Sequence, residues 1–383
     1  MTLPLDGSIE RAFGITRPNF ILDPAVDFEC FARHDINVTA IVENLQIDLV
    51  TKLAPKRLLW GPYGGGKTHT LYSTLNELAR LTPIHPLRVE CPDLAKRSVF
   101  NDLYRDGVMP VLGEDTVVQL LERVAIEKVP LGRREEYLKR LREYLGDEPL
   151  SKAVAQLMNP NFERLKLWAW LSGIPLSRTE LSDLGQTQDL ASAEPARLAE
   201  IIVLIGRVMK KVDGKTLVLC LDEMERLRAV GPDSIATFVT GFTRLMDPNQ
   251  RDVAVLLGSS AAQFDEMPDI FARHGPVVSR LSPQATIEVP HIPDPDVDDF
   301  IRQVISFVRD KSANVDELLK SAKTTCGETL DLDFFPFSVD AIQAMKSRLT
   351  RDMTPREITL AMTQAAGRAH LIGRACVTSD LVS

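Results

Sequence analysis

The sequence predicts an α/β fold, in which a parallel sheet flanked by helices carries a large helical insertion and is followed by a C-terminal helical domain. A glycine-rich turn that begins at Gly61 joins a short apolar run to a segment with helical periodicity, as in the strand–turn–helix unit of α/β proteins. From about His291 onward, apolar residues recur at three- and four-residue spacing, which is typical of packed helices. Four further strands are predicted at residues 87–91, 216–221, 253–258 and 285–289, and two of them, 216–221 and 253–258, are continuous apolar runs typical of strands covered on both faces.

The composition is that of a globular protein and excludes several classes. With 383 residues, the chain suffices for two or three domains, at roughly 100–200 residues each. Its 44% hydrophobic and 26% charged residues exclude a disordered or fibrous protein. No apolar stretch approaches the roughly 20 residues of a membrane-spanning helix, and the first residues lack the features of a secretory signal. We therefore expect a cytoplasmic protein without membrane association.

Net charge, cysteines and histidines exclude further chemistry. The net charge of −8 argues against attraction of the whole surface to nucleic acid, so any DNA contact is expected to be local. The five cysteines are scattered and never in C-x-x-C spacing, and the six histidines form no H-x-x-x-H pair. The sequence therefore indicates neither a disulfide framework nor a zinc site, and no nucleophilic triad.

The strongest motif is a full match to G-x-x-x-x-G-K-[ST], in a turn between a strand predicted at residues 57–60 and a helix predicted at 68–81. Glycines allow positive φ, so that successive N–H groups turn inward around phosphate oxygens at a helix N-terminus. Lys67 is then expected to reach the β and γ phosphates, and the Thr68 hydroxyl to ligate Mg²⁺. The residues expected to bind the nucleotide are Gly61, Pro62, Tyr63, Gly64, Gly65, Gly66, Lys67, Thr68 and His69.

A pair of carboxylates follows the apolar run at residues 216–221, as in a Walker B element. Asp222 is expected to hold Mg²⁺ through its water shell, and Glu223 to activate the water that attacks the γ-phosphate. The N-K-x-D tetrapeptide with which GTPases read guanine does not occur in the sequence. The sequence therefore predicts an enzyme that hydrolyses ATP with Mg²⁺.

The next apolar run, residues 253–258, ends in Ser259 and Ser260 after a helix predicted around residues 235–245. With this spacing the sequence resembles the AAA+ ATPases, in which a polar residue at this place, called sensor 1, helps to position the attacking water. Ser259 or Ser260 would serve, and plain capping of the strand is the alternative.

An arginine before the strand at 285–289 extends the resemblance. Ser279-Arg280-Leu281 is similar to the arginine-finger region of AAA+ proteins, where one subunit stabilises charge on the γ-phosphate of its neighbour. Arg280 is the first candidate and Arg273 the second, and an internal ion pair is the alternative for each. The resemblance implies a homo-oligomer, either a ring or a filament.

The C-terminal helices resemble an AAA+ lid domain. They are predicted at residues 301–308, 315–322, 339–349 and 355–371. Thr354 is a suitable N-cap for the last helix and Pro355 suits its first turn. Arg356 resembles the sensor 2 arginine, which touches the nucleotide from the lid, whereas an ordinary surface arginine is the alternative. The predicted domains are an N-terminal helical segment (1–50), the AAA+ core (51–292) and the lid (293–383).

The stretch between Lys67 and Asp222 is far longer than a minimal core needs, and roughly a hundred residues are inserted, at about residues 95–211. Their pattern is almost entirely helical, and we expect them to pack on the core. A W-L-x-G-x-x-L-x-R-x-E segment begins at Trp170 and precedes the Walker B strand. It is similar to a bacterial family of ATP-binding proteins associated with BREX-type phage defence, near the origin-recognition branch of AAA+ proteins. Trp168 and Trp170 are expected to be core or domain-packing residues, and base stacking is the alternative.

Together these features imply an AAA+ ATPase whose oligomer acts on a DNA-associated complex, in phage defence or mobile-element control. The alternatives are a slow nucleotide-dependent switch or recruitment module that signals to a partner effector, and a transposition-regulator ATPase. No DNA-reading domain is expected after the lid, so DNA contact would come through the oligomer or a partner protein. The helix predicted within residues 133–144 mixes both charges and is expected to be a solvated face, with DNA or partner binding as its alternative.

Overall fold

The computed structural model of the chain describes residues 8–30, 33, 36–51, 53–92, 99–130, 132–272, 274–281, 285–349 and 353–382. The chain divides into two compact units. We call Met1–Ile41, Gly61–Asn76 and Glu288–Ser383 the helical unit, and Val42–Trp60 and Glu77–Ile287 the sheet unit.

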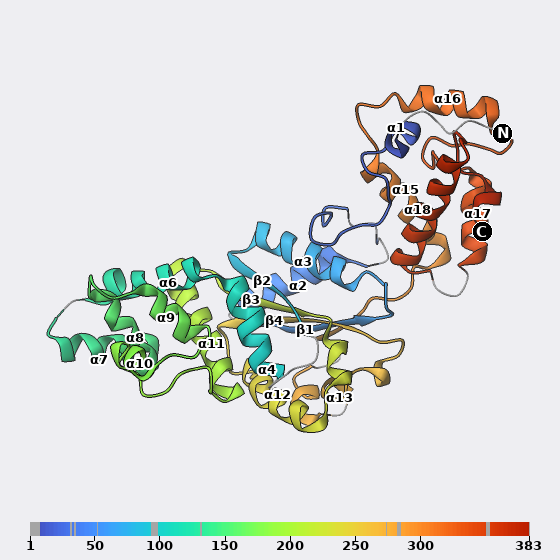
Figure 1. Cartoon of the computed structure of the whole chain (residues 1–383). Helices are drawn as coiled ribbons and strands as arrows, with labels where there is room; N and C mark the ends of the chain where they lie inside the picture. The colour runs from blue at the N-terminus through green and yellow to red at the C-terminus, as the bar shows by residue number, and fades with distance from the viewer. Residues whose placement is uncertain are drawn as a thin grey trace. The chain divides into compact units, whose positions relative to one another are not determined.

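The sheet unit contains a five-stranded sheet with the strand order β2-β3-β4-β1-β5 (Figure 1). Strand β3 pairs in parallel with β2 and with β4, so that Glu90 lies opposite Asp222 and Leu221 opposite Leu257. The carboxyl ends of these three strands therefore share one edge, and the predicted α/β fold class is confirmed. The strands are β1 (Lys56–Gly61), β2 (Ile84–Glu90), β3 (Thr216–Asp222), β4 (Val253–Ser260) and β5 (Thr286–Glu288).

Burial explains why the central strands form where the sequence predicts them. All seven residues of β3 are buried, and β4 is buried up to its last residue. Continuous apolar runs of this kind suit strands whose two faces are both covered. Strand β4 extends through Ser259 and Ser260, so the two serines end the strand, which is two residues longer than the strand predicted at 253–258.

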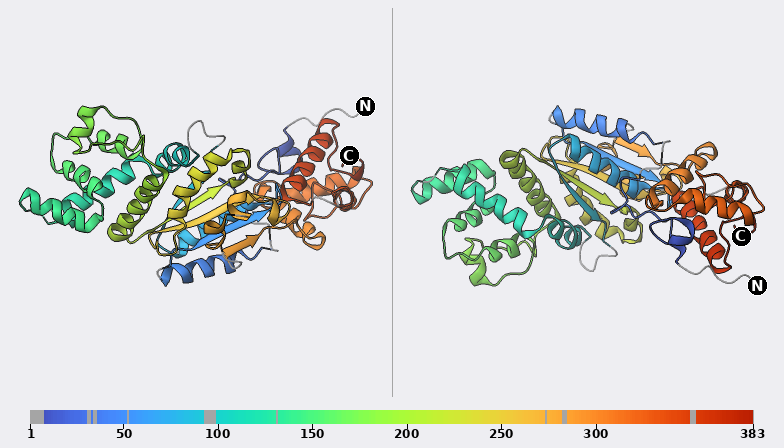
Figure 2. Two further views of the ribbon diagram at one scale, coloured as in Figure 1. Left: turned by 90° about the horizontal axis from the view of Figure 1, so that it is seen from below. Right: turned by 90° about the horizontal axis from the view of Figure 1, so that it is seen from above.

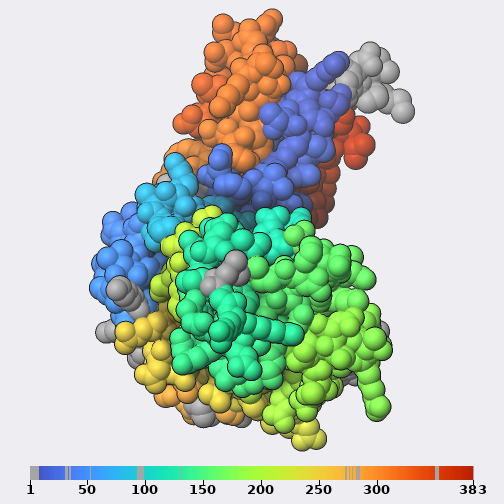
Figure 3. Space-filling model, turned by 90° about the vertical axis from the view of Figure 1, so that its left-hand side faces the viewer, coloured from blue at the N-terminus to red at the C-terminus, as the bar shows by residue number. Residues whose placement is uncertain are grey.

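Helices cover the sheet and form the insertion. Figure 1 shows α2 on one face of the sheet and α12 on the other. Helix α11 contacts β3, β4 and α6, and both views of Figure 2 show it between the sheet and the other insertion helices. The outer side of the insertion faces the viewer in Figure 3. The helices are α2 (Val38–Val50), α3 (Lys67–Leu81), α4 (Val99–Asp102), α5 (Met109–Leu112), α6 (Glu114–Arg123), α7 (Arg134–Leu145), α8 (Glu148–Ala155), α9 (Arg164–Leu171), α10 (Arg178–Asp183), α11 (Pro195–Asp213), α12 (Pro232–Leu245), α13 (Asp269–Ala272) and α14 (Gly275–Val278).

The insertion packs on the core as predicted. Trp170 is 1% exposed and belongs to the same apolar cluster as the strands, and Trp168 packs against that cluster. Helix α7 confirms the helix predicted within residues 133–144, and Arg140 and Glu136 on it form an exposed ion pair one turn apart. Trp170 is therefore a core residue, and the partly buried Trp168 packs against the core.

The helical unit contains the four predicted C-terminal helices. Three of them share an apolar core that includes Ile301, Ile305 and Met362, whereas the helix Val315–Thr325 contributes Leu319 and Ala322 to a second, smaller cluster. Residues near the N-terminus join this core: Phe13 and Phe20 are buried in it, and the Thr16 Oγ1 donates to the Val308 carbonyl at 3.0 Å. That packing was not predicted. The helices are α1 (Ile9–Phe13), α15 (Asp294–Val308), α16 (Val315–Thr325), α17 (Val339–Arg348) and α18 (Pro355–Leu371).

Three further observations concern the described residues. None of the described helices is long and apolar enough to cross a membrane. All five cysteines are free thiols. Within the described ranges, no three His, Cys, Asp or Glu side chains come together as a metal site.

Candidate functional site

The glycine-rich loop lies where the sequence places it, between the end of β1 at Gly61 and the start of α3 at Lys67. Gly64 has a φ of 76° and Gly66 a φ of 89°, in the left-handed region that glycine adopts without strain. Such a turn aims successive backbone N–H groups toward one point at the N-terminus of a helix. The backbone of the loop therefore fits a phosphate group.

The lysine of the motif is folded onto its own loop. Lys67 is 6% exposed, and its Nζ donates to the Pro62 carbonyl at 2.7 Å. Thr68 follows in the first turn of α3, a helix of 15 residues. An ammonium held on a loop carbonyl beside converging N–H groups is positioned to exchange that carbonyl for a phosphate oxygen.

Arg33, which the sequence analysis missed, holds the loop from behind. Its side chain is 4% exposed, and it donates to the Gly65 carbonyl at 2.6 Å and to the Pro290 carbonyl at 2.8 Å. These partners lie 32 and 257 positions away along the chain, so no local pattern could indicate the contact. A buried guanidinium thus fixes the phosphate loop to the segment that precedes α15.

His69 lies on the side of α3 that meets the N-terminal segment. Burial lowers the pKa of its imidazole, which lies beside the backbone of Cys30 and the carboxylate of Asp27. One turn further along α3, the Ser73 hydroxyl donates to the Phe28 carbonyl at 2.9 Å. His69, predicted as a nucleotide-binding residue, therefore packs on residues 27–30 in this structure.

The predicted sensor 2 arginine lies against the phosphate loop. Thr354 caps α18 by accepting from the Glu357 N–H at 3.2 Å, and Pro355 begins the helix, so both predictions for this terminus are confirmed. Arg356 donates from Nη1 to the Tyr63 hydroxyl at 2.6 Å, and its backbone N–H donates to the Gly64 carbonyl at 3.4 Å. The helical unit thus brings together two residues that the sequence predicted for one site.

The predicted Walker B carboxylates lie in the sheet unit. Asp222 ends β3, is 4% exposed, and accepts the Glu223 N–H on Oδ1 at 2.9 Å. Glu223 has a φ of 57°, and such a left-handed conformation costs about 1–3 kcal/mol for a residue with a side chain. The Glu223 carboxylate is paired with Arg226, which also donates to the Cys91 carbonyl at 2.6 Å. Strained conformations of this kind persist only where the surrounding structure enforces them, and they cluster at functional sites.

Glu225 connects this turn to the end of β4. Its Oε2 accepts the Ser260 N–H at 2.8 Å, and Arg228 donates to the Ser260 carbonyl at 3.2 Å. Ser260 is half-buried through these contacts, whereas Ser259 is fully buried and its hydroxyl has no hydrogen-bond partner among the described residues. The two sensor 1 candidates therefore differ in environment. The sequence reasoning did not predict this role of Glu225, although the residue could be found as the last member of the D-E-x-E sequence.

The first arginine-finger candidate makes an internal contact. Arg280 is half-buried and donates from Nη1 to the Thr243 carbonyl at 3.0 Å, near the end of α12. This is a hydrogen bond, and within the described part of the chain Arg280 has no carboxylate partner. The second candidate, Arg273, lies outside the described residues. A trans-acting role for either arginine stays a prediction.

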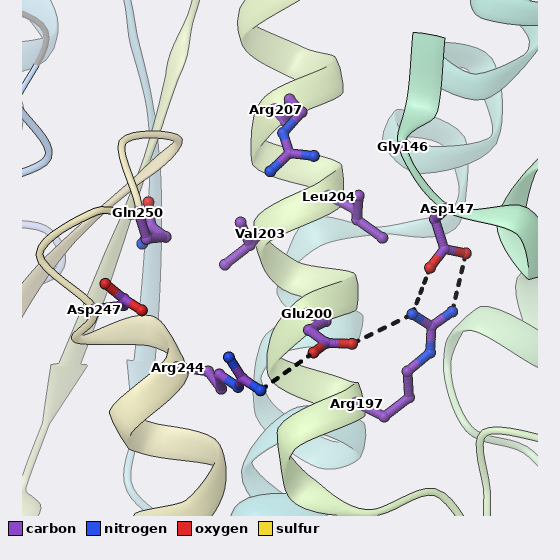
Figure 4. A pocket seen from close by; sticks show the side chains of 10 residues that line it. All are labelled: Gly146, Asp147, Arg197, Glu200, Val203, Leu204, Arg207, Arg244, Asp247 and Gln250. Atoms are coloured by element: carbon purple, nitrogen blue, oxygen red, sulfur yellow. Dashed lines mark hydrogen bonds and ion pairs between the residues drawn. The ribbon is translucent and has the colours of Figure 1, made fainter. Parts of the chain in front are cut away.

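A charged pocket of about 250 Å³ between α11 and α12 contains none of the predicted site residues (Figure 4). Arg197 donates to both carboxylate oxygens of Asp147, at 2.5 and 3.0 Å, and lies 3.5 Å from Glu200. Glu200 in turn lies 4.0 Å from Arg244. The four side chains neutralise one another's charges, so these ion pairs offer no surplus charge to a ligand.

Comparisons with known proteins give a distant structural similarity. No protein-family model and no curated protein matches the chain. The chain is similar to the ORC2 protein of Aeropyrum pernix, solved in ADPNP–ADP complexes, with a TM-score of 0.44 and 11% identity over 90% of this chain and 65% of that one. It is also similar to Cdc6p of Pyrobaculum aerophilum, with a TM-score of 0.41 and 13% identity over 89% and 64% of the two chains. The chain thus spans less than two thirds of both proteins, and the resemblance to a phage-defence family gains no support here.

Proposed function

We propose that this protein is an AAA+ ATPase that binds Mg–ATP on the loop from Gly61 to Thr68 and hydrolyses it. The observation that carries the proposal is the loop itself: a strand–turn–helix unit with two glycines at positive φ and a buried lysine held on a loop carbonyl. That combination of converging N–H donors and a poised cation suits the phosphates of a nucleotide.

The proposal gives each polar residue one task. Lys67 and the loop N–H groups would bind the phosphates, and Glu223 would accept a proton from the attacking water. The Thr68 hydroxyl would ligate Mg²⁺, and Asp222 would hold it through its water shell. When bound, Mg²⁺ would neutralise part of the phosphate charge. The burial of Asp222 and the strained turn at Glu223 support these assignments.

Ser259 is the better candidate for sensor 1 in this account. A fully buried hydroxyl without a partner among the described residues is costly unless a ligand or an ordered water completes it. By contrast, both the backbone N–H and the carbonyl of Ser260 are hydrogen-bonded, to Glu225 and Arg228. We assign Ser259 the contact with the attacking water.

The wider function follows from the resemblance in the sequence. We propose that subunits assemble through Arg280 into an oligomer, and that the oligomer acts on a DNA-associated complex, in phage defence or mobile-element control. A second candidate is a slow switch that signals its nucleotide state to a partner. Two contacts favour this second candidate, because Glu223 is paired with Arg226 and Arg280 with the Thr243 carbonyl of its own chain.

Steady-state ATP hydrolysis by Glu223→Gln tests the proposal. We expect turnover to fall by at least about a hundredfold, the weight of a general base, while ATP binding is retained. Glu266→Gln is the matched control, because Glu266 is exposed and its side chain has no interaction among the described residues. Wild-type turnover in Glu223→Gln would show that the Walker B assignment is wrong.

A further inference from the structure

Tyr63 is an unexpected residue for a phosphate-binding loop. The loop needs glycines and a lysine, and no phosphate contact requires an aromatic ring. The Tyr63 side chain is nevertheless 69% exposed and reaches outward from the loop. Among the described residues its side chain interacts with one partner, Arg356. We therefore expect the Tyr63 ring to act through its contact with Arg356.

Arg356 is fixed in front of Tyr63 by its own backbone. It stands in the first turn of α18, which Thr354 caps. A Cβ added to Gly64 would lie 3.1 Å from the Cβ of Arg356 and 3.1 Å from the Thr354 Oγ1, so the loop and the start of α18 are in contact. The backbone of Arg356 is therefore held in place, and only its side chain can change hydrogen-bond partners near the loop.

The contacts between the Arg356 guanidinium and Tyr63 are weak enough to be exchanged for a stronger partner. Its Cζ lies 5.0 Å from the centroid of the Tyr63 ring, and Nη1 donates to the Tyr63 hydroxyl at 2.6 Å. No carboxylate within the described ranges pairs with Arg356. Ring and hydroxyl contacts at an exposed site are weak compared with a charge-assisted pair between arginine and phosphate. A nucleotide phosphate would therefore draw the guanidinium from the hydroxyl while the ring still supports it.

We propose that Tyr63 is a positioning residue that holds Arg356 for the terminal phosphate of ATP. This inference rests on the proposed function and deepens it. Because ADP lacks the γ-phosphate, the contact of Arg356 favours ATP over ADP, and Tyr63 contributes to that preference through the arginine alone.

A double-mutant cycle on nucleotide affinity tests this inference. Calorimetric titrations with Mg–ATP and Mg–ADP are made on Tyr63→Ala, Arg356→Ala and the double variant, all in the Glu223→Gln background so that ATP stays intact. We expect each single change to weaken ATP binding by about threefold to tenfold, and ADP binding by less than about twofold. The double variant should bind ATP no more weakly than Arg356→Ala. Tyr63→Phe keeps the ring that supports the arginine in the bound state and removes only the hydroxyl that ATP displaces, so it should bind ATP at least as tightly as the wild type.

Arg302→Ala is the matched control. Its guanidinium lies 4.7 Å from the centroid of the Phe334 ring in the same helical unit and has no contact with the loop, so both affinities should be unchanged. Additive losses of ATP affinity in the double variant, or an equal loss of ADP affinity in Tyr63→Ala, would overturn the inference, because Tyr63 would then act on the loop itself. If Lys67→Ala also left ATP binding unchanged, the proposed function would fail together with the inference. If ATP binding requires Lys67 and the two losses are additive, only the inference fails.

Discussion

Arg33 offers a direct test of how the phosphate loop is held. Arg33→Met keeps most of the buried volume and removes both donors, which reach the Gly65 and Pro290 carbonyls at 2.6 and 2.8 Å. A hydrogen bond from a charged group is worth about 1.5–3 kcal/mol. Two such bonds set an upper value of about 6 kcal/mol, and relief of the desolvated charge reduces it, so we expect a loss of about 3 kcal/mol in the free energy of unfolding. Because Gly65 loses its anchor, ATP affinity should also fall, by about tenfold or more.

Urea denaturation and nucleotide titration measure the two effects. Arg374→Met is the control: Arg374 forms an exposed ion pair with Asp380 at 2.7 Å in the same unit, and such surface pairs contribute under about 1 kcal/mol. Its ATP affinity should equal that of the wild type. If Arg33→Met lost no more stability than Arg374→Met and kept wild-type ATP affinity, the anchoring role of Arg33 would be refuted.

Three further predictions concern the sheet unit. Gly241→Ala should lower stability by about 1–3 kcal/mol in thermal melts, because a Cβ there would lie 2.8 Å from three atoms of the fully buried Phe100 ring; an unchanged melting temperature would contradict this packing. Burial lowers the pKa of Lys56 to about 8 from 10.5, so its contribution to stability is complete above pH 10.5 and is lost as the pH falls through about 8. In urea melts, the free energy of unfolding of the wild type should therefore rise relative to that of Lys56→Met as the pH is raised from about 8 to 10.5. Equal pH dependence in the two proteins would exclude the shift. Arg280→Ala should lower ATP turnover while ATP affinity is kept, and a mixture with Glu223→Gln should recover activity that neither variant has alone; no recovery would favour the switch.

Features encoded by neighbouring residues could be predicted from the sequence. The phosphate loop, the buried strand before Asp222 and the Thr354 cap each depend on a few consecutive side chains and their backbone. The choice between Ser259 and Ser260 could not be made in this way, because successive residues of a strand point to opposite faces and a one-residue error in its end reverses them.

Contacts between distant segments carried no sequence signal. Arg356 and Tyr63 lie 293 positions apart, and Thr16 and Val308 lie 292 positions apart. Such pairs depend on how helices pack, which periodicity does not specify. The left-handed conformation of Glu223 also could not be predicted from the sequence. That conformation is uncommon for a residue other than glycine and persists only where the surrounding structure enforces it.

If Lys67 binds the phosphates of ATP, calorimetric titration of Mg–ATP should separate the wild type from Lys67→Ala. Lys139→Ala, at an exposed lysine of α7, is the control. We expect one saturable ATP site in the wild type and in Lys139→Ala. In Lys67→Ala the affinity should be at least about a hundredfold lower, since a buried cation on the phosphates is lost. Equal ATP affinity in all three proteins, or no binding to the wild type, would contradict this expectation.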